Sequence, residues 1–503
     1  MNVNQKMANP SSAFARIGLY ARSETRFFHI ALARLLKQRF GSKIVLYSGD
    51  TQKSEFYAQH GDEIFSDIVN VKTPHACAVE QALDMTVEID RARKLESRFG
   101  KTFNYLSISN RHLGRGYALG GFYHPRSRYS EETGYINLLH AYNEVMEFWD
   151  REMSQRNLTL LMNGPYESAV VSRVHGIPYR VFAGSRYLNF HNWAWNEFYE
   201  NPEFEAAYNA GEGGGLQELE RPYHAHLVNR AQYMKQRSLL QFCKRAADQI
   251  ARYFWWKLRG YAKARGYYLS QRVAIIYRIW SETRHLSKLA TTTLKDLQGN
   301  RFVYFPLHQE PESALQELSP EYFYQLSAIA AIARDLPAGV RLAVKETFGA
   351  IGRRPRDFYR QIAEFKNVVL LETLELGLDC VRQADAVVTI CGTAGFEGAV
   401  LGKSVIAFGH HNNYNFLPHI HFIEKESDLR SALALVLGQS GSSQFLLDGQ
   451  RFLRATVVRS FDMRGYHPSA ATKFDPQSVE EACQALERGL TLASSNASAG
   501  RVG

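Results

Sequence analysis

Cysteine is scarce in this chain of 503 residues, and long apolar runs are missing from it. The five cysteines lie far apart, which argues against a disulfide framework or a structural zinc site and favours a reducing compartment. No uncharged apolar stretch reaches about 18 residues, so we expect no membrane-spanning helix. No apolar run follows the first charged residues, so we expect no secretory signal and a cytoplasmic location.

Glycine and proline, with 36 and 15 residues, are too few for a fibrous or low-complexity protein. The hydrophobic share of 45% and the charged share of 22% are typical of globular proteins. A chain of this length is expected to form roughly two to four domains, each with a core that needs no cross-links.

Positive charge is concentrated in one segment. The net charge of the chain is +10, yet residues 230–288 alone carry fourteen lysines and arginines against Asp248 and Glu282. The segment contains Trp255, Trp256 and Trp280, lacks proline and is predicted to be helical. It could be an insertion with inward aromatic side chains, an interfacial membrane helix or a nucleic-acid surface. Since no recognised nucleic-acid-binding module is present, we expect an anionic membrane surface as a partner and no nucleic acid.

Short apolar runs alternate with longer amphipathic ones, which is typical of an α/β protein with parallel sheets. In the first half the predicted strands are Arg16–Tyr20, Lys43–Ser48, Ile68–Val71, Phe103–Ile108, Leu158–Met162 and Tyr179–Ala183. In the second half they are Phe302–Leu307, Arg341–Lys345, Val368–Leu371, Ala386–Ile390 and Val405–Phe408. We therefore predict two doubly wound domains of the Rossmann type that face a cleft.

The predicted boundaries follow from this alternation and from the basic segment. We expect an N-terminal Rossmann-like domain over residues 1–205, a basic, aromatic helical insertion over 206–297 and a C-terminal Rossmann-like domain over 298–465. A C-terminal helix is expected over 466–492, and a disordered tail rich in serine, alanine and glycine over 493–503.

Ligands of open parallel sheets bind beyond the carboxyl ends of the strands, and several motifs lie there. In Thr389–Glu397 a strand ends in a loop with Gly392 and Gly395, and a helix begins at once. Glycines permit close approach of a ligand, and a helix N-terminus attracts phosphate. Glu397 could bind a ribose. The alternative is an ordinary strand–helix turn, with Glu397 placed favourably on the helix dipole.

Two further strand ends carry charged groups. Lys345 and Glu346 close one strand, and Arg353 follows, so these cations could neutralise a diphosphate or could be solvated surface groups. Another strand is followed by a histidine, a glutamine and two glutamates (His308, Gln309, Glu310 and Glu312). These side chains could transfer a proton, bind sugar hydroxyls or cap a helix.

The motifs occur in an order that resembles a known family. From about Phe302 to Tyr414 the chain carries Phe-Pro-Leu-His-Gln-Glu-Pro-Glu-Ser, then Val-Lys-Glu, Gly-Arg, Gly-Thr-Ala-Gly-Phe-Glu and Gly-Lys-Ser-Val. This order resembles the capsular polysaccharide biosynthesis proteins, bacterial glycosyltransferases of the GT-B type related to capsule Kdo transferases. The family usually has His-Pro after the Lys-Glu pair, whereas this chain has Thr347 and Phe348.

The resemblance implies transfer of a sugar from a CMP- or UDP-linked donor to a growing capsule polysaccharide or glycolipid, at the inner face of the cell membrane. It implies a donor site made by Gln309, Glu310, Glu312, Lys345, Glu346, Arg353, Gly392, Thr393, Ala394, Gly395 and Glu397. Lys345, Arg353 and the helix end would stabilise the departing phosphate. No cofactor or metal is expected, because the chain lacks the Asp-X-Asp triplet that holds a divalent cation in the other large transferase class.

An inverting transferase also needs a group that takes the proton of the acceptor hydroxyl. The candidates are Glu24 and Glu167, each after an apolar strand of the first half, and His308. Arg22, Arg26 and Arg186 are predicted on the acceptor side, with a further loop at His124–Arg126. Two other functions stay open: a nucleotide-sugar epimerase of the same architecture, and a non-catalytic scaffold of a polysaccharide assembly complex.

Overall fold

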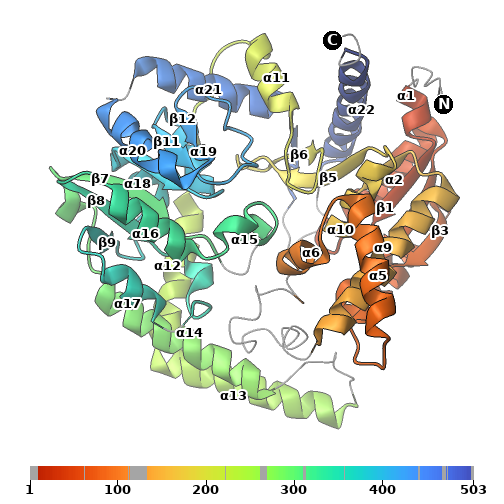
Figure 1. The fold of residues 1–503 in the computed structure, drawn as a ribbon, viewed down its shortest axis with the longest axis horizontal. Coiled ribbons are helices and arrows are strands. Elements are labelled where there is room, and N and C mark those ends of the chain that lie inside the picture. Colours follow the sequence, from red (N-terminus) through yellow and green to blue (C-terminus); the bar gives the residue numbers. More distant parts are fainter. Residues whose placement is uncertain are drawn as a thin grey trace. The chain divides into compact units, whose positions relative to one another are not determined.

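The computed structural model describes residues 10–61, 63–110, 113, 133–220, 223–260, 269–309, 313–355, 357–439, 442–466, 472 and 474–499 (Figure 1). The chain divides into two compact units. Unit 1 comprises Met1–Leu106, Gly134–Gly214 and Arg454–Gly503, and unit 2 comprises Ser107–Thr133 and Gly215–Leu453. The chain therefore leaves unit 1 and returns to it near its C-terminus.

Unit 1 is built on a seven-stranded sheet in the order β13-β6-β5-β4-β1-β2-β3. Its strands are β1 (Arg16–Tyr20), β2 (Lys43–Ser48), β3 (Phe65–Asn70), β4 (Leu160–Met162), β5 (Tyr179–Gly184), β6 (Phe190–Ala194) and β13 (Phe461–Asp462). Strands β1 to β5 are parallel, and the antiparallel β6 and β13 extend one edge. Because β2 and β4 lie on opposite sides of β1, the strand order reverses between β1 and β4.

The helices of unit 1 bury apolar faces against this sheet and against each other. They are α1 (Pro10–Ala13), α2 (Arg26–Phe40), α3 (Thr51–His60), α4 (Pro74–Cys77), α5 (Met85–Phe99), α6 (Phe103–Ser109), α9 (Tyr135–Arg156), α10 (Tyr166–Val174), α11 (Glu203–Ala210) and α22 (Pro476–Ala499). Helix α3 begins where the Asp50 carboxylate accepts the backbone N–H of Gln52 at 2.8 Å. Helix α2 ends at Gly41, whose φ of 65° is a conformation that favours glycine.

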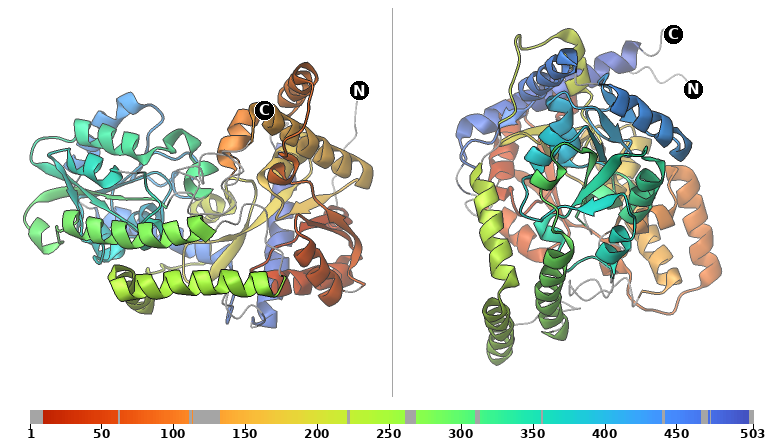
Figure 2. Two further views of the ribbon diagram at one scale, coloured as in Figure 1. Left: turned by 90° about the horizontal axis from the view of Figure 1, so that it is seen from below. Right: turned by 90° about the vertical axis from the view of Figure 1, so that its left-hand side faces the viewer.

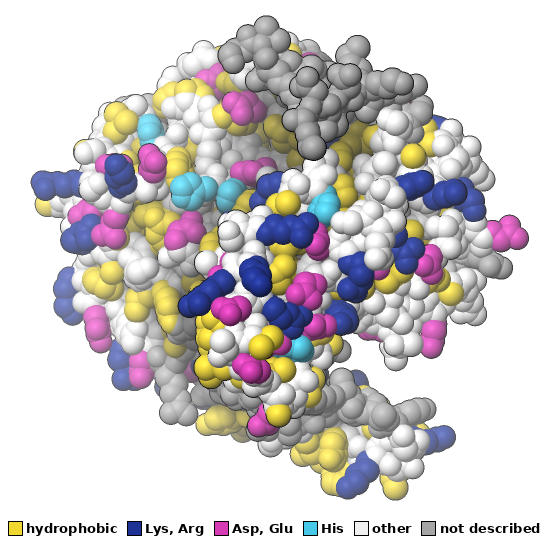
Figure 3. All heavy atoms as spheres, turned by 45° about the vertical axis from the view of Figure 1, so that its right-hand side comes forward, with side chains coloured by type: hydrophobic (Ala, Val, Ile, Leu, Met, Phe, Trp, Pro, Cys, Tyr) yellow, Lys and Arg dark blue, Asp and Glu magenta, His cyan; other side chains and the backbone are white. Residues whose placement is uncertain are grey.

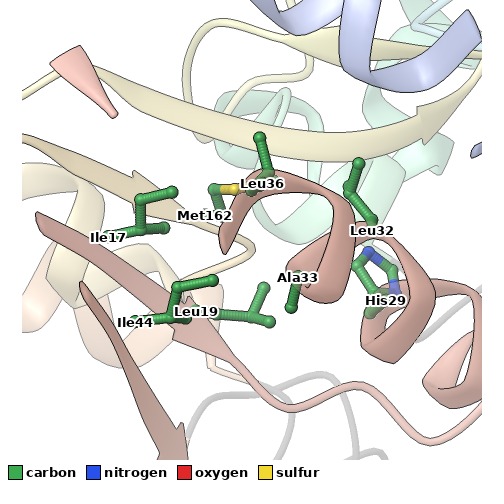
Figure 4. A pocket seen from close by; sticks show the side chains of 8 residues that line it. All are labelled: Ile17, Leu19, His29, Leu32, Ala33, Leu36, Ile44 and Met162. Carbon is green, nitrogen blue, oxygen red and sulfur yellow. The ribbon is translucent and has the colours of Figure 1, made fainter. Parts of the chain in front are cut away.

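A small cavity lies in the core of unit 1 (Figure 4). Its volume of about 10 Å³ is room for one water molecule at most, so it is a packing defect rather than a ligand site. Its lining consists of seven apolar side chains and one histidine: Ile17, Leu19, His29, Leu32, Ala33, Leu36, Ile44 and Met162.

His29 is held in this core as a neutral imidazole. Its Nδ1 donates to the carbonyl oxygen of Thr25 at 2.9 Å, so its Nε2 accepts from the Asn163 amide at 2.8 Å. The Asn163 side-chain oxygen in turn accepts the backbone N–H of Phe182 at 2.8 Å. Burial, reinforced by the positive charge of Arg22, lowers the pKa of His29 from 6.5 to about 3.

We expect the stability of the protein to fall in mild acid because of this histidine. Between pH 3 and pH 6.5 the unfolded chain binds a proton at His29 that the folded protein does not bind. The contribution of His29 is therefore complete above pH 6.5 and declines below it, by about 2 kcal/mol at pH 5. Urea unfolding at pH 7 and pH 5 should show a smaller difference for His29→Gln than for the unchanged protein. His60→Gln, which alters an exposed histidine, is the control, and an unchanged pH dependence in His29→Gln would contradict the prediction.

Unit 2 is built on a six-stranded sheet in the order β12-β11-β10-β7-β8-β9. Its strands are β7 (Arg301–Pro306), β8 (Val340–Lys345), β9 (Val368–Leu370), β10 (Ala386–Thr389), β11 (Val405–Ala407) and β12 (Ile420–Phe422). All neighbouring pairs are parallel. The chain runs from β7 outward to β9 and returns to the other side of β7 with β10, so the strand order reverses between β7 and β10.

The helices of unit 2 cover this sheet and form an arm beside it (Figures 1 and 2). Those around the sheet are α15 (Ser313–Gln316), α16 (Gln325–Asp335), α17 (Phe358–Ala363), α18 (Gly377–Gln383), α19 (Thr393–Val400), α20 (Leu429–Gly438) and α21 (Ser443–Val458), which runs on into unit 1. The arm consists of α12 (Tyr223–Arg237), α13 (Leu239–Leu258) and α14 (Leu269–Leu289). No described helix combines the length and the apolar character that a bilayer crossing needs.

The two predicted doubly wound domains are confirmed, but several details differ, and strands β6, β12 and β13 were not predicted. Residues 103–109 form helix α6, whereas a strand was predicted over 103–108. The C-terminal helix is Pro476–Ala499, so it includes positions that were expected to be disordered. The chain also divides differently from the predicted boundaries, because the basic helices belong to unit 2 and residues from Arg454 onward belong to unit 1.

Candidate functional site

The carboxyl ends of β7 and β10 bring two of the predicted motifs together in unit 2. His308 follows β7, and its Nε2 accepts the backbone N–H of Cys391, which follows β10, at 3.2 Å. The Thr389 hydroxyl lies 3.4 Å from the same nitrogen. A nitrogen that accepts an N–H bond carries no proton, so this geometry fixes the neutral form of His308. The point at which the strand order reverses is where open α/β sheets bind their ligands.

The two glycines of the loop after β10 have different neighbours from those predicted. A Cβ on Gly392 would lie 2.9 Å from Nε2 of His308, and a Cβ on Gly395 would overlap the buried Tyr414 hydroxyl. Both glycines therefore make room for side chains of the protein itself. His308 and Tyr414 thus fill the space at the Cβ positions of these glycines, and donor binding by their backbone stays a prediction.

Helix α19 presents its N-terminus at the same place. Its N-cap residue is Gly392, which has no side chain to accept the first backbone N–H groups. Thr393 is exposed and Ala394 is buried. Anions are stabilised at such a helix end by N–H groups and by the dipole. Glu397, the fifth residue of α19, lies in its second turn and is half-buried. Burial raises the pKa of Tyr304 on β7, and the charges of Cys380 and Glu397 add to this effect.

Glu346 has a different role from the one predicted. Its carboxylate accepts two bonds from the Arg354 guanidinium, at 2.7 and 2.8 Å, and one from the Tyr359 hydroxyl at 2.8 Å. Arg354 also donates to the carbonyl oxygen of His308 at 2.7 Å. The side chains of Glu346 and Arg354 are each 1% exposed. Glu346 thus forms a buried ion pair that holds the segment after β7, and both of its carboxylate oxygens have protein partners.

Lys345 and Gln309 lie next to this ion pair. The Lys345 ammonium donates to the carbonyl oxygen of Glu346 at 3.3 Å and lies 5.7 Å from the centre of the Phe348 ring. Burial lowers the pKa of Lys345. The Gln309 amide rests on Gly349, where a Cβ would lie 2.7 Å from its Oε1. At the departure from the family motif, Phe348 therefore packs beside the lysine.

Several polar atoms near the strand ends of unit 2 are buried without a protein partner. Among the described residues these include Thr373 Oγ1 after β9, Ser319 Oγ, both amide atoms of Gln316 and Asn412 Oδ1. Ser319 lies against Gly409, which follows β11. Buried polar groups are normally satisfied, so such atoms indicate water or ligand contacts. None of these residues was predicted as a site residue, although Thr373 and Asn412 follow predicted strands closely.

Unit 1 has a second group of candidates where its strand order reverses between β1 and β4. Glu24 is exposed, and its carbonyl oxygen accepts the Tyr466 hydroxyl at 2.6 Å. Glu167, at the start of α10, is only 5% exposed. Burial first, and then the charge of Glu167, raises the pKa of Tyr20 at the end of β1 to about 12. The Glu167 carboxylate and the Tyr20 phenol are therefore close.

The three arginines predicted on the acceptor side belong to unit 1. The Arg26 guanidinium stacks over the Phe56 ring at 4.0 Å, and the backbone oxygen of Arg22 accepts the Tyr57 hydroxyl at 3.0 Å. Arg186 has a φ of 59° in the connection between β5 and β6, an unusual conformation for a residue with a Cβ. Glu310, Glu312 and the loop His124–Arg126 lie outside the described residues. Within the described ranges no cluster of three His, Cys, Asp or Glu side chains could hold a metal ion.

Comparison with known proteins gives structural neighbours only. No family model matches this chain, and no curated protein matches it. The chain is similar to KpsC from Thermosulfurimonas dismutans, a β-Kdo 2,7-transferase, with 12% identity over 58% of this chain and 74% of that one and a TM-score of 0.28. It is also similar to the spinosyn rhamnosyltransferase SpnG, with 10% identity over 88% and 99% and a TM-score of 0.28.

A putative UDP-N-acetylglucosamine 2-epimerase from Listeria monocytogenes is similar at 9% identity, over 87% of this chain and 94% of that one, with a TM-score of 0.25. The assignment of the fold rests on the two sheets themselves: an α/β protein with two doubly wound units of the Rossmann type, the domain composition of GT-B proteins. The solved structures that it resembles include Kdo transferases and other glycosyltransferases.

Proposed function

We propose that this protein is a glycosyltransferase that moves a sugar from a nucleotide-activated donor to a growing surface glycan. The observation that supports it most is the junction of β7 and β10 in unit 2. There the neutral His308 and the uncapped N-terminus of α19 meet at the carboxyl end of a parallel sheet, and Glu397 follows in the second turn of the same helix. A phosphate would bind the helix end, Lys345 would supply positive charge, and Glu397 would accept hydrogen bonds from a ribose.

Unit 1 would supply the acceptor side. In this proposal Glu24 or Glu167 takes the proton of the attacking hydroxyl, and the departing phosphate is stabilised by the helix end without a metal ion. Glu24 is in contact with solvent, whereas Glu167 is buried beside Tyr20. The acceptor is a capsule or cell-surface glycan, and a glycan carried on a lipid would place the enzyme at the inner face of the membrane.

Thermal unfolding in the presence of nucleotides tests the donor assignment. A ligand that binds only the folded protein stabilises it by about 2.7 kcal/mol at a concentration 100 times its dissociation constant. We expect either CMP or UDP, with the corresponding nucleotide sugar, to raise the unfolding temperature, and GDP to have little effect. A chain that none of these compounds stabilises would behave as a scaffold and would contradict the proposal.

Incubation of the stabilising nucleotide sugar without acceptor then separates transfer from epimerisation. We expect slow hydrolysis, because water can replace the acceptor hydroxyl of a transferase. NMR of the anomeric proton detects the products. Conversion of the nucleotide sugar to its epimer would assign the protein to the epimerases instead.

A further inference from the structure

Helix α13 has an apolar face that no described part of the protein covers. None of its residues is buried. Leu240, Phe254 and Leu258 are 75%, 55% and 84% exposed, and Ile250 is 40% exposed. Positions 240, 247, 251, 254 and 258 follow the spacing of one helix face, so these side chains form a continuous stripe with Ala247 and Ala251 between them.

The other side of α13 is occupied by α14. The Phe242 ring stacks on Trp280 with centroids 5.3 Å apart, and it meets the Tyr277 ring edge-on at 6.1 Å. Tyr253 and Trp256, on the same side as Phe242, are half-buried. The aromatic side chains thus divide between a packed face and an exposed one, so packing accounts for only part of them.

Basic side chains border the exposed stripe. Lys244, Arg245 and Arg252 are exposed along one side of it, and within the described ranges Arg252 alone of the three forms an ion pair, with Asp248 at 3.0 Å. Arg259 follows the helix and stacks over the exposed Trp255 ring at 4.5 Å. Figure 3 shows hydrophobic and basic side chains together on the part of the arm drawn at the bottom of the view.

The arm packs firmly on the rest of unit 2. A Cβ on Gly352 would lie 2.7 Å from Ile279 of α14, so this helix packs directly on the turn that precedes Arg353. Arg278 of α14 donates to the carbonyl oxygen of Arg354. A surface that binds α13 would therefore hold the donor unit through contacts next to the buried Glu346–Arg354 pair.

We propose that α13 lies flat on an anionic lipid surface, with Leu240, Ile250, Phe254 and Leu258 inserted among the acyl chains and Lys244, Arg245 and Arg252 at the headgroups. An exposed apolar stripe next to a basic border is the pattern of helices that bind in the plane of a membrane. Each lysine or arginine near an anionic surface adds attraction that salt weakens, and tryptophan at position 255 is suited to the headgroup region. The acidic neighbour Asp248 reduces the charge but leaves the border basic. This inference goes beyond sugar transfer and holds for any reaction of the protein.

Sedimentation with vesicles tests the proposal on the full chain. We expect binding to phosphatidylcholine vesicles that contain roughly 30 to 40% phosphatidylglycerol, because this anionic lipid gives the vesicle a negative surface potential. Pure phosphatidylcholine should bind at least about ten-fold less, and higher salt should weaken binding to the anionic vesicles. Absence of binding to anionic vesicles at low salt would overturn the proposal, as would binding that neither salt nor lipid charge affects.

Two variants separate the apolar and the basic contributions. Leu240→Ser with Phe254→Ser and Leu258→Ser should abolish binding, whereas Leu435→Ser with Leu446→Ser and Leu447→Ser, exposed on other helices of unit 2, should not. Lys244→Gln with Arg245→Gln and Arg252→Gln should lower binding about ten-fold or more and remove its salt dependence. The matched triple of Arg341→Gln, Lys366→Gln and Arg430→Gln makes the same change of charge at exposed positions elsewhere. Equal losses in test and control variants would contradict a role for α13.

Two readouts keep the outcomes distinct. The unfolding temperature and its increase with nucleotide should be the same in the α13 variants and the unchanged protein, since the substituted side chains are exposed. Failure of nucleotide binding would then count against the proposed transferase alone, and failure of vesicle binding against the role of α13 alone. If analytical ultracentrifugation shows that the chain self-associates through the apolar stripe and does not bind vesicles, the occupant is a second copy, and the lipid proposal is wrong.

Discussion

Replacement of Arg354 by methionine is expected to destabilise unit 2 by about 3–5 kcal/mol, because it leaves the Glu346 carboxylate buried without its counter-charge. The methionine would fill much of the space of the arginine side chain, so the loss would come from the charge rather than from a cavity. The same substitution removes the bond from Arg354 to the carbonyl oxygen of His308. The segment after β7 would then lose one of its anchors and keep the bonds between Gln325 and the backbone of His308.

The unfolding temperature measures this effect. A loss of this size should lower the transition of unit 2 by on the order of 10 °C. Arg353→Met is the matched control, because it removes the same charge from the neighbouring, half-buried residue. A decrease in Arg353→Met as large as in Arg354→Met would show that the buried pair has no special role. Glu346→Gln should also destabilise, since it leaves the Arg354 charge without a partner.

Loss of the Glu397 carboxylate is expected to weaken binding of the stabilising nucleotide ten- to a hundred-fold, equivalent to about 1.5–3 kcal/mol. The reason is that the ribose hydroxyls would lose a charged hydrogen-bond acceptor in the second turn of α19. Lys345→Met should weaken binding to a similar extent, because it removes a positive charge near the phosphate. Isothermal titration calorimetry with Glu397→Gln and Lys345→Met gives both values.

Matched variants on the surface of unit 2 serve as controls for these two. Glu364→Gln and Lys366→Met change the same charges at exposed positions and should bind the nucleotide normally. If both site variants fold and bind the nucleotide with unchanged affinity, unit 2 is not the nucleotide unit. A loss in Lys345→Met alone would place the phosphate near β8 and leave the role of Glu397 unsupported.

Most strands could be predicted because strands that are buried on both faces of a parallel sheet appear in the sequence as short apolar runs. The segment Phe103–Ser109 shows the limit of this rule. Its buried residues are Phe103, Leu106 and Ser109, three positions apart, which is a helical spacing. A short run of apolar and polar residues fits both periodicities, so tertiary packing decides between them.

The sequence predicts which strand ends carry the candidate site residues, but it does not predict which of these residues are in contact. His308 and the loop at Gly392 each follow a strand, yet only the order of strands in space makes β7 and β10 neighbours. The sequence also grouped Lys345 with Glu346, although consecutive residues of an extended chain point to opposite sides. That alternation could have separated the two side chains: the lysine lies beside the Phe348 ring, and the glutamate turns into the ion pair with Arg354.

The return of the chain to unit 1 bears on how the protein is made. Strand β13 completes the sheet edge beside β6, and α22 contributes Val479, Leu486 and Leu490 to the core around α2. During synthesis on the ribosome, unit 2 can close around its sheet once Leu453 has emerged. We expect unit 1 to complete its core only after β13 and α22 have emerged, since the part of α2 that packs on α22 stays uncovered until then. Unit 2 is therefore expected to complete its core before unit 1, and the exposed apolar surface of the incomplete unit 1 is prone to aggregation in the meantime.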